Sequence, residues 1–185
     1  MRKVERADII DFVTYGDRRD QMRAAAMAAK MPRRIHVGPH LTFLFENHQT
    51  IVYQVQEMMR AEQIVRDADI QHEIDTYNTL LGGPGELGCT LMIEITSPAE
   101  RDEKLTAWLG LHAHLYARLP DNQKVYATFD AAQVGDTRLS SVQYLLFDVG
   151  GVTPVAIGCD FPAHTHEAIL DQAQAAALDL DLQQV

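Results

Sequence analysis

The sequence is poor in cysteine, contains no long apolar run and has no overall excess of positive charge, and each absence narrows the class of protein. Its 185 residues include only two cysteines, Cys89 and Cys159, which lie far apart in apolar, strand-like surroundings. We expect buried thiols rather than a disulfide. A membrane helix needs about 18 or more successive apolar residues, and none occur. The N-terminal segment also lacks the apolar core of a signal peptide, so we expect a soluble, cytoplasmic protein.

The shortage of positive charge argues against a nucleic-acid partner. The net charge is −10, whereas nucleic-acid binding requires clustered Lys and Arg. Residues 1–34 are the exception, with nine Lys and Arg against five Asp and Glu, a local +4 that leaves −14 for the remainder. Six of these nine basic residues are the candidates for a basic face: Arg18, Arg19, Arg23, Lys30, Arg33 and Arg34. They form either a solvated helix face that also packs on the acidic body or a surface for an anion or an acidic partner.

Helical periodicity dominates the first half of the chain. Helix formers, capping residues and breakers place a short β-hairpin, turned at Gly38-Pro39, between two pairs of helices. Asn47 is the expected N-cap of the third helix. The expected helices span residues 7–15, 17–30, 49–66 and 69–81, and the expected strands span residues 33–37 and 41–46.

Alternating apolar residues replace the helical period after the break at Gly82-Gly83-Pro84-Gly85. The expected strands span residues 90–95, 112–118, 124–129, 141–149 and 153–160, and the expected helices run from Pro98 to Gly110 and over residues 164–178. Hairpin-like connections favour antiparallel pairing. The predicted fold class is therefore α+β: a helical N-terminal half with a short β-hairpin, packed on a mostly antiparallel C-terminal sheet with a C-terminal helix. The length predicts a single domain, residues 1–185, with a helical lobe over 1–82 and a sheet lobe over 86–180.

Glu62 interrupts the apolar stripe of the expected 49–66 helix. The stripe consists of Ile51, Val55, Met58 and Val65, and Glu62 lies four residues after Met58. Burying an unpaired carboxylate costs several kcal/mol, so Glu62 should be neutral, paired with an arginine such as Arg33 or Arg34, or bound to a metal. The helix could also end earlier and leave Glu62 exposed.

Further carboxylates and one histidine lie in the same block of sequence. Glu73 lies at the edge of the next helix's stripe, and His40, Glu46 and Glu94 lie on or beside the flanking strands. Together with Glu62 they form a candidate metal site, with Glu46, Glu57 or Glu94 as additional ligands or supporting groups. Carboxylates and imidazole suit iron, manganese or zinc. No Glu-x-x-His, His-Glu-x-x-His or Cys-x-x-Cys motif accompanies them, so the indication comes from expected burial.

Two His-x-His pairs are weaker candidates for metal ligands. His112 and His114 fall on an expected strand, and His164 and His166 fall at the start of the expected last helix. Exposed surface histidines are the commoner outcome for such pairs.

The central block resembles a bacterial family known only as the domain of unknown function 3501. The matching segments begin with VGPH at residues 37–40 and continue through residues 42–47, 54–58, 60–62, 73, 77–78, 83–87 and 90–94, with a weaker match at 141–145. All six candidate ligands lie within these segments. The resemblance implies no assigned activity. It does imply genes encoded near iron–sulfur oxidoreductases and rubrerythrin-like proteins, and hence a link to peroxide or oxygen stress.

The sequence is compatible with three functions. The first is a metal-binding protein, with iron favoured over other divalent metals, that acts beside a redox protein partner. The second is a non-catalytic adaptor that binds an iron–sulfur or rubrerythrin-like protein through its basic N-terminal helices or a sheet edge. A homodimer is compatible with either. The third is general acid–base chemistry by a desolvated Glu62, which would need a pocket.

Overall fold

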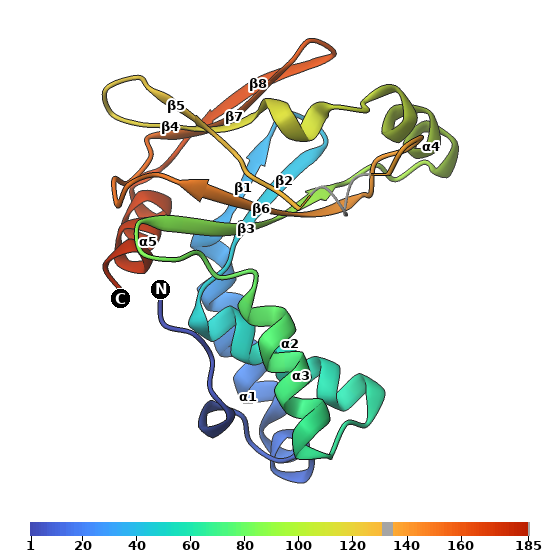
Figure 1. Ribbon diagram of the computed structural model, residues 1–185, viewed down its shortest axis with the longest axis vertical. Coiled ribbons are helices and arrows are strands. Elements are labelled where there is room, and N and C mark those ends of the chain that lie inside the picture. The colour runs from blue at the N-terminus through green and yellow to red at the C-terminus, as the bar shows by residue number, and fades with distance from the viewer. Residues whose placement is uncertain (131–134, 185) are drawn as a thin grey trace.

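The computed structural model describes residues 1–130 and 135–184, which form two antiparallel sheets and a layer of helices (Figure 1). The first sheet has the order β1-β2-β3-β6, with strands β1 (Arg34–Val37), β2 (Leu41–Phe45), β3 (Glu86–Ile93) and β6 (Val142–Asp148). The second sheet has the order β5-β4-β7-β8, with strands β5 (Lys124–Tyr126), β4 (Leu115–Arg118), β7 (Ala156–Phe161) and β8 (His164–Ile169).

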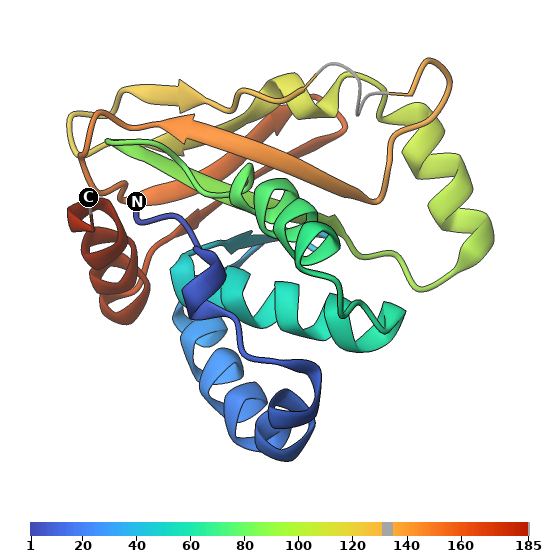
Figure 2. The ribbon, with the colours of Figure 1, turned by 60° about the horizontal axis from the view of Figure 1, so that its bottom comes forward.

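The helices lie outside the pair of sheets. Their bounds are α1 (Phe12–Lys30), α2 (His48–Glu62), α3 (Asp67–Asn78), α4 (Pro98–Ala107) and α5 (Gln172–Gln183), with short 3-10 turns at η1 (Arg6–Asp8), η2 (Met31–Arg33) and η3 (Leu111–His114). Helices α1, α2 and α3 form one layer, and α5 packs at another side of the sheets (Figures 1 and 2). No helix in the described residues has both the length and the apolar character needed to cross a membrane.

The main hydrophobic core lies between the two sheets. Phe43 and Phe45 of the first sheet contact Phe147 with ring centroids 6.5 and 5.9 Å away. Leu115 and Ile157 contribute to the core from the second sheet, and both are fully buried. Because side chains alternate across a strand, each sheet leaves its other face free for helices or solvent.

A second, smaller apolar cluster joins the helices to each other. It contains Ile51, Val55 and Met59 of α2 and Ile70 and Ile74 of α3, all almost fully buried. Helix α1 lies against α2 at the periphery of this layer (Figure 1). Only two side chains of α1, Tyr15 and Ala26, are buried, so most of its surface is exposed or half-exposed.

The α+β class predicted from the sequence is confirmed, and so are the hairpin of β1 and β2, the strand β6, the N-cap of α2 at Asn47 and the start of α4 at Pro98. Asn47 caps α2 by accepting a hydrogen bond from the Thr50 amide at 3.0 Å. Ser97 caps α4, with Pro98 in its first turn. These features follow from local backbone chemistry, which explains why the sequence predicts them.

Three element predictions are wrong. Residues 7–15 and 17–30 do not form two helices: α1 is continuous through Gly16 and begins at the N-cap Asp11. The expected strand 112–118 begins with the η3 turn, and the expected helix 164–178 is strand β8 followed by α5. In β8 the inward-facing side chains include a histidine and an alanine, so the strand lacks the apolar alternation that would reveal it.

The number and membership of the sheets also differ from expectation. The sequence predicts one C-terminal sheet, whereas residues 1–130 and 135–184 form two sheets, and the β1–β2 hairpin is hydrogen-bonded to β3 within the first. Strands from both halves of the chain therefore share one sheet. Such long-range pairing is not encoded in local periodicity.

Replacing Gly16 by Ala should raise the free energy of unfolding by roughly 0.5–1 kcal/mol, because glycine is a poor residue inside a helix. The added Cβ would meet no atom within 4 Å. Gly88→Ala is the opposite case, because its Cβ would collide with the backbone carbonyl of Leu80. Urea unfolding of both variants provides the measurement. A destabilised Gly16→Ala protein would contradict a continuous α1.

Candidate functional site

Glu62 does not lie in a buried stripe. It is the last residue of α2 and is exposed, because the helix ends where Gln63 takes a left-handed backbone conformation with φ of 55°. The buried face of α2 contains Met59 rather than Met58, and Val65 beyond the helix is 68% exposed. The prediction that Glu62 is buried and needs a partner is therefore wrong, and the alternative of an earlier helix end holds.

Glu57 forms an ion pair between the first two helices. Its carboxylate accepts hydrogen bonds from Nε and Nη2 of Arg19 at 2.8 and 2.7 Å, and from the Tyr15 hydroxyl at 2.5 Å. The hydrogen bond from Arg19 is the main cause that lowers the pKa of Glu57 to about 2, against an opposing effect of burial. Burial, together with the neighbouring Glu57, raises the pKa of Tyr15. This cluster fastens α1 to α2.

Glu46 and Glu94 accept hydrogen bonds from threonines of the first sheet and of helix α2. Glu46 is buried and accepts from Thr50 at 2.6 Å and from Thr90 at 2.9 Å. Glu94 accepts from Thr42 at 2.5 Å. Both carboxylates thus link elements that are separate in sequence: Glu46 links β2, α2 and β3, and Glu94 links the end of β3 to β2.

Among the described residues, Glu73 and His40 do not belong to a group of potential metal ligands, although the Glu94 amide donates to the His40 carbonyl at 2.7 Å. Glu73 is half-buried on α3, and Nε2 of His40 lies 2.8 Å from the Lys104 ammonium on α4. In the part of the chain that the structure describes, no group of three or more His, Cys, Asp or Glu side chains is placed to hold a metal ion. The six candidate ligands, all described, are therefore not brought together into one site.

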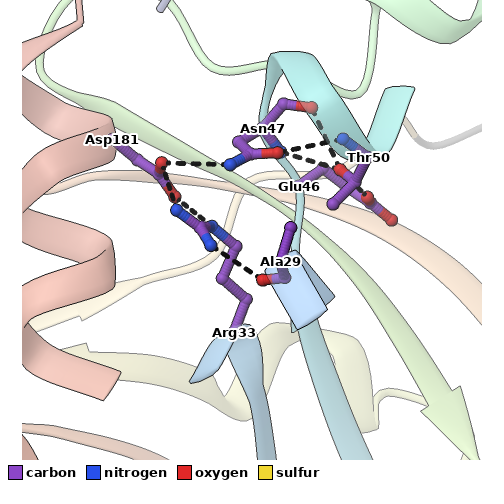
Figure 3. A network of polar contacts seen from close by, with 6 residues as sticks. All are labelled: Ala29, Arg33, Glu46, Asn47, Thr50 and Asp181. Carbon is purple, nitrogen blue, oxygen red and sulfur yellow. Dashed lines mark hydrogen bonds and ion pairs between the residues drawn. The ribbon is translucent and has the colours of Figure 1, made fainter. Parts of the chain in front are cut away.

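The most buried ion pair among the described residues joins the η2 turn, which follows α1, to helix α5 (Figure 3). Arg33 Nε and Nη2 donate to the two carboxylate oxygens of Asp181 at 2.6 and 2.8 Å, and both side chains are less than a tenth exposed. Arg33 Nη1 also donates to the Ala29 carbonyl at 2.7 Å, and the Asn47 amide lies 3.4 Å from Asp181. The sequence suggested Arg33 as a partner of Glu62, and nothing in the sequence pointed to Asp181.

A histidine-rich corner forms where the β1–β2 turn meets β8 and α4. The ring centroids of His40 and His164 lie 6.1 Å apart, and those of His164 and His166 lie 4.6 Å apart. Burial lowers the pKa of His164, and nearby positive groups, including Lys104, act in the same direction. Neutral His164 donates from Nε2 to the Val37 carbonyl at 3.3 Å and so ties β8 to β1. The expected helical His-x-His pair is thus one buried and one exposed residue of a strand.

The two cysteines are free and buried, as the sequence predicts. Burial raises the pKa of Cys159 to about 11 and raises the pKa of Cys89 well above its usual value. The thiolate is the reactive form of cysteine, and a raised pKa keeps the thiol protonated. Both cysteines therefore differ from nucleophilic or redox thiols, which lie in electropositive, accessible surroundings.

A shallow groove runs between the C-terminal half of α1 and strand β1. We call it the α1 groove; it has a volume of about 520 Å³ and is lined by Ala24, Met27, Ala28, Lys30, Met31, Arg34 and His36. Met27 is 37% and Met31 is 74% exposed, so the groove presents apolar surface to solvent. Isolated exposed apolar residues are ordinary on proteins, but two methionines within one groove form a patch.

Three cations lie in or beside the α1 groove: Lys30 and Arg34 belong to its lining, and Arg23 directly precedes the lining residue Ala24. Arg23 on α1 and Arg34 on β1 are exposed, and neither side chain has an ion-pair or hydrogen-bond partner among the described residues. Lys30 lies over the Tyr53 ring at 5.5 Å from its centroid. The basic face expected from the sequence is therefore divided: Arg19 and Arg33 hold buried or half-buried carboxylates, whereas Arg18, Arg23 and Arg34 remain exposed. Sequence reasoning missed the methionines, although their spacing of four residues was a signal.

Comparison with known proteins identifies relatives but no activity. The family model described as "Protein of unknown function (DUF3501)" matches residues 3–182. A crystal structure of a novel protein of unknown function from Burkholderia pseudomallei is 31% identical, with a TM-score of 0.90, over 98% of this chain and 100% of that chain. No curated protein matches.

Asp181→Ala should reduce the free energy of unfolding by about 3–5 kcal/mol, because it leaves the Arg33 guanidinium buried without a counter-charge. Asp179→Ala is the matched control on α5, because Asp179 is exposed and accepts hydrogen bonds from Thr153 and Gln183. We expect its free energy of unfolding to fall by less than about 1 kcal/mol. Urea unfolding measures both. Equal losses in the two variants would show that the buried pair contributes no more than a surface contact.

Glu57 should make stability depend on pH in the acidic range. Because its folded pKa is lowered, the folded state binds fewer protons than the unfolded state between the two values. The stabilisation is complete above about pH 4.5, the ordinary value, and decreases as the pH falls toward about 2. Unfolding measured across this range should show a weaker pH dependence in Glu57→Gln than in the wild type. Glu103→Gln, an exposed carboxylate on α4, should retain the wild-type profile.

Proposed function

The chain belongs to the DUF3501 family, whose function is unknown, and we propose that it acts as a non-catalytic adaptor that binds an acidic protein partner in the α1 groove. The observation that carries this proposal is the combination of exposed Met27 and Met31 with the exposed cations Arg23 and Arg34, which have no ion-pair partner in the described part of the chain. Apolar surface with a charged rim is the usual composition of a protein-binding patch.

The contacts made by the potentially reactive side chains support a scaffold role. Glu57 is held by an arginine and a tyrosine, Glu46 by two threonines and Glu94 by a third. These bonds connect helices to helices and strands to strands. A side chain committed to such bonds is less available as a general base or ligand, because its release would leave its partners unsatisfied.

Charge asymmetry favours one orientation of an acidic partner. Residues 1–34 carry +4, and the remainder of the chain carries −14. An acidic protein is therefore repelled by most of the molecule and attracted to the region of α1 and β1. Such complementarity acts mainly on the association rate and on specificity, and salt screens it over about 10 Å at 0.1 M ionic strength.

For the identity of the partner we propose an iron–sulfur or rubrerythrin-like protein, which is the neighbourhood that the family resemblance implies. Any chemistry linked to oxygen or peroxide would then take place on the partner. An iron site within this chain is not part of the proposal, because the six candidate ligands are not gathered by the fold.

The double variant Arg23→Glu/Arg34→Glu should bind a purified iron–sulfur or rubrerythrin-like protein encoded beside this one at least about tenfold more weakly, since it reverses the charge of Arg34 in the groove lining and of Arg23 beside it. Titration calorimetry at low and at moderate salt gives the affinity and its salt dependence, which should both decrease in the variant. The control Arg66→Glu/Arg101→Glu makes the same change in net charge on α4 and beside α3. Equal weakening by both double variants, or no binding by either candidate partner at low salt, would contradict the proposal.

A further inference from the structure

We infer that the segment bound in the α1 groove is an amphipathic α-helix with acidic residues beside its apolar stripe. This inference rests on the proposed function and adds the conformation and the chemical pattern of the partner. It comes from three features: the spacing of the apolar residues, the position of the cations, and the state of the β1 edge.

The exposed apolar residues in the last two turns of α1 and at the start of η2 follow the spacing of a helix–helix seam. Ala24, Met27 and Met31 are separated by three and then four residues, as are successive seam positions of a coiled coil. Ala28 lies beside them, and its small side chain, like that of Ala24, lets a second helix approach closely. Methionine is flexible and polarisable, so it adapts to a partner's side chains.

The cations occupy the positions that flank such a seam. Arg23 and Lys30 are seven residues apart, and each immediately precedes a seam residue, Ala24 or Met31. In coiled coils these flanking positions form ion pairs with the facing helix and so select the partner. Arg34 extends the positive edge onto β1. A facing helix should therefore carry Glu or Asp next to its apolar residues.

The edge of β1 is poorly suited to bind an extended segment instead. Strand β1 is the edge of the first sheet but has only four residues. The carbonyl of Arg34 accepts a hydrogen bond from the Gln174 side chain at 3.4 Å, and that of Val37 accepts one from His164 at 3.3 Å. Strand addition needs open main-chain groups along the edge, and side chains from α5 and β8 already contact these two.

A second copy of the same α1 is also disfavoured as the occupant. In a two-fold contact both copies contribute the same patch, so the interface would gather Arg23, Lys30 and Arg34 twice, from the two copies. Like charges placed opposite each other across an interface cost several kcal/mol. The facing surface should thus be acidic and come from another protein.

Three labelled synthetic peptides of equal length test the inference on the full chain. The first has a heptad pattern with Leu at the seam and Glu at the flanking positions; the second replaces each Glu by Lys; the third has the composition of the first with apolar and acidic residues alternating. Fluorescence anisotropy should show binding of the first peptide at least about tenfold tighter than of the other two. Circular dichroism should show an increase of its helicity on binding.

The variant Met31→Asp should weaken binding of the first peptide at least about tenfold, because it places a carboxylate in the apolar seam. Val13→Asp is the matched control, since Val13 lies at the other end of α1, away from the groove, and is 71% exposed, compared with 74% for Met31. Thermal unfolding should show that both variants are folded.

The outcomes separate this inference from the proposed function. Equal or tighter binding of the alternating or the Lys-containing peptide, or no binding of the acidic heptad peptide, overturns the inference. If the charge-reversal double variant Arg23→Glu/Arg34→Glu still weakens binding of the partner protein in those cases, the proposed function stands, but the bound segment is not a helix of this pattern. If that double variant also leaves partner binding unchanged, both are overturned.

Discussion

The buried ion pair between Arg33 and Asp181 is the contact on which the arrangement of the molecule depends. Arg33 lies in the short turn between α1 and β1, and Asp181 lies in the last helix. Asn47, which caps α2, approaches the same carboxylate (Figure 3). One carboxylate therefore fixes the junction of the helical layer, the first sheet and α5. Both charges are almost completely removed from water, so each needs the other as a counter-charge.

The same junction sets the geometry of the α1 groove. The groove has one wall on α1 and the other on β1, and the chain passes from one wall to the other through residues 31–33. A groove between two elements keeps its shape only if the angle between them is fixed. The bidentate pair supplies that fixed point, because the planar guanidinium and the carboxylate match in only a narrow range of orientations. The surface for which we propose a binding role thus depends on a contact made inside the protein.

The carboxylates of the central block have structural roles of a related kind. Glu57 holds α1 to α2, Glu46 joins β2 to α2 and β3, and Glu94 contacts β2. In a protein with an excess of acidic residues, cations near a helix junction stabilise the fold by pairing with carboxylates there. Arg19 and Arg33 serve in this way, which leaves Arg18, Arg23 and Arg34 as the exposed positive charge of the region. The similar protein from Burkholderia pseudomallei has the same fold. It is described as a protein of unknown function, as is the family.

The sequence by itself determined the α+β class, the family, the capped start of α2 at Asn47, the β1–β2 hairpin and the buried thiols, because each depends on neighbouring residues or on composition. It also located the basic region on α1. It could not determine that Glu62 is exposed, because the helix end depends on a single residue, Gln63, in a left-handed conformation. Nor could it pair Arg33 with Asp181, since residues 148 positions apart meet only through the packing of α5. Only the tertiary structure decided which charges form ion pairs inside the protein and which face solvent. Burial and pairing are set by long-range contacts, which leave no local period in the sequence.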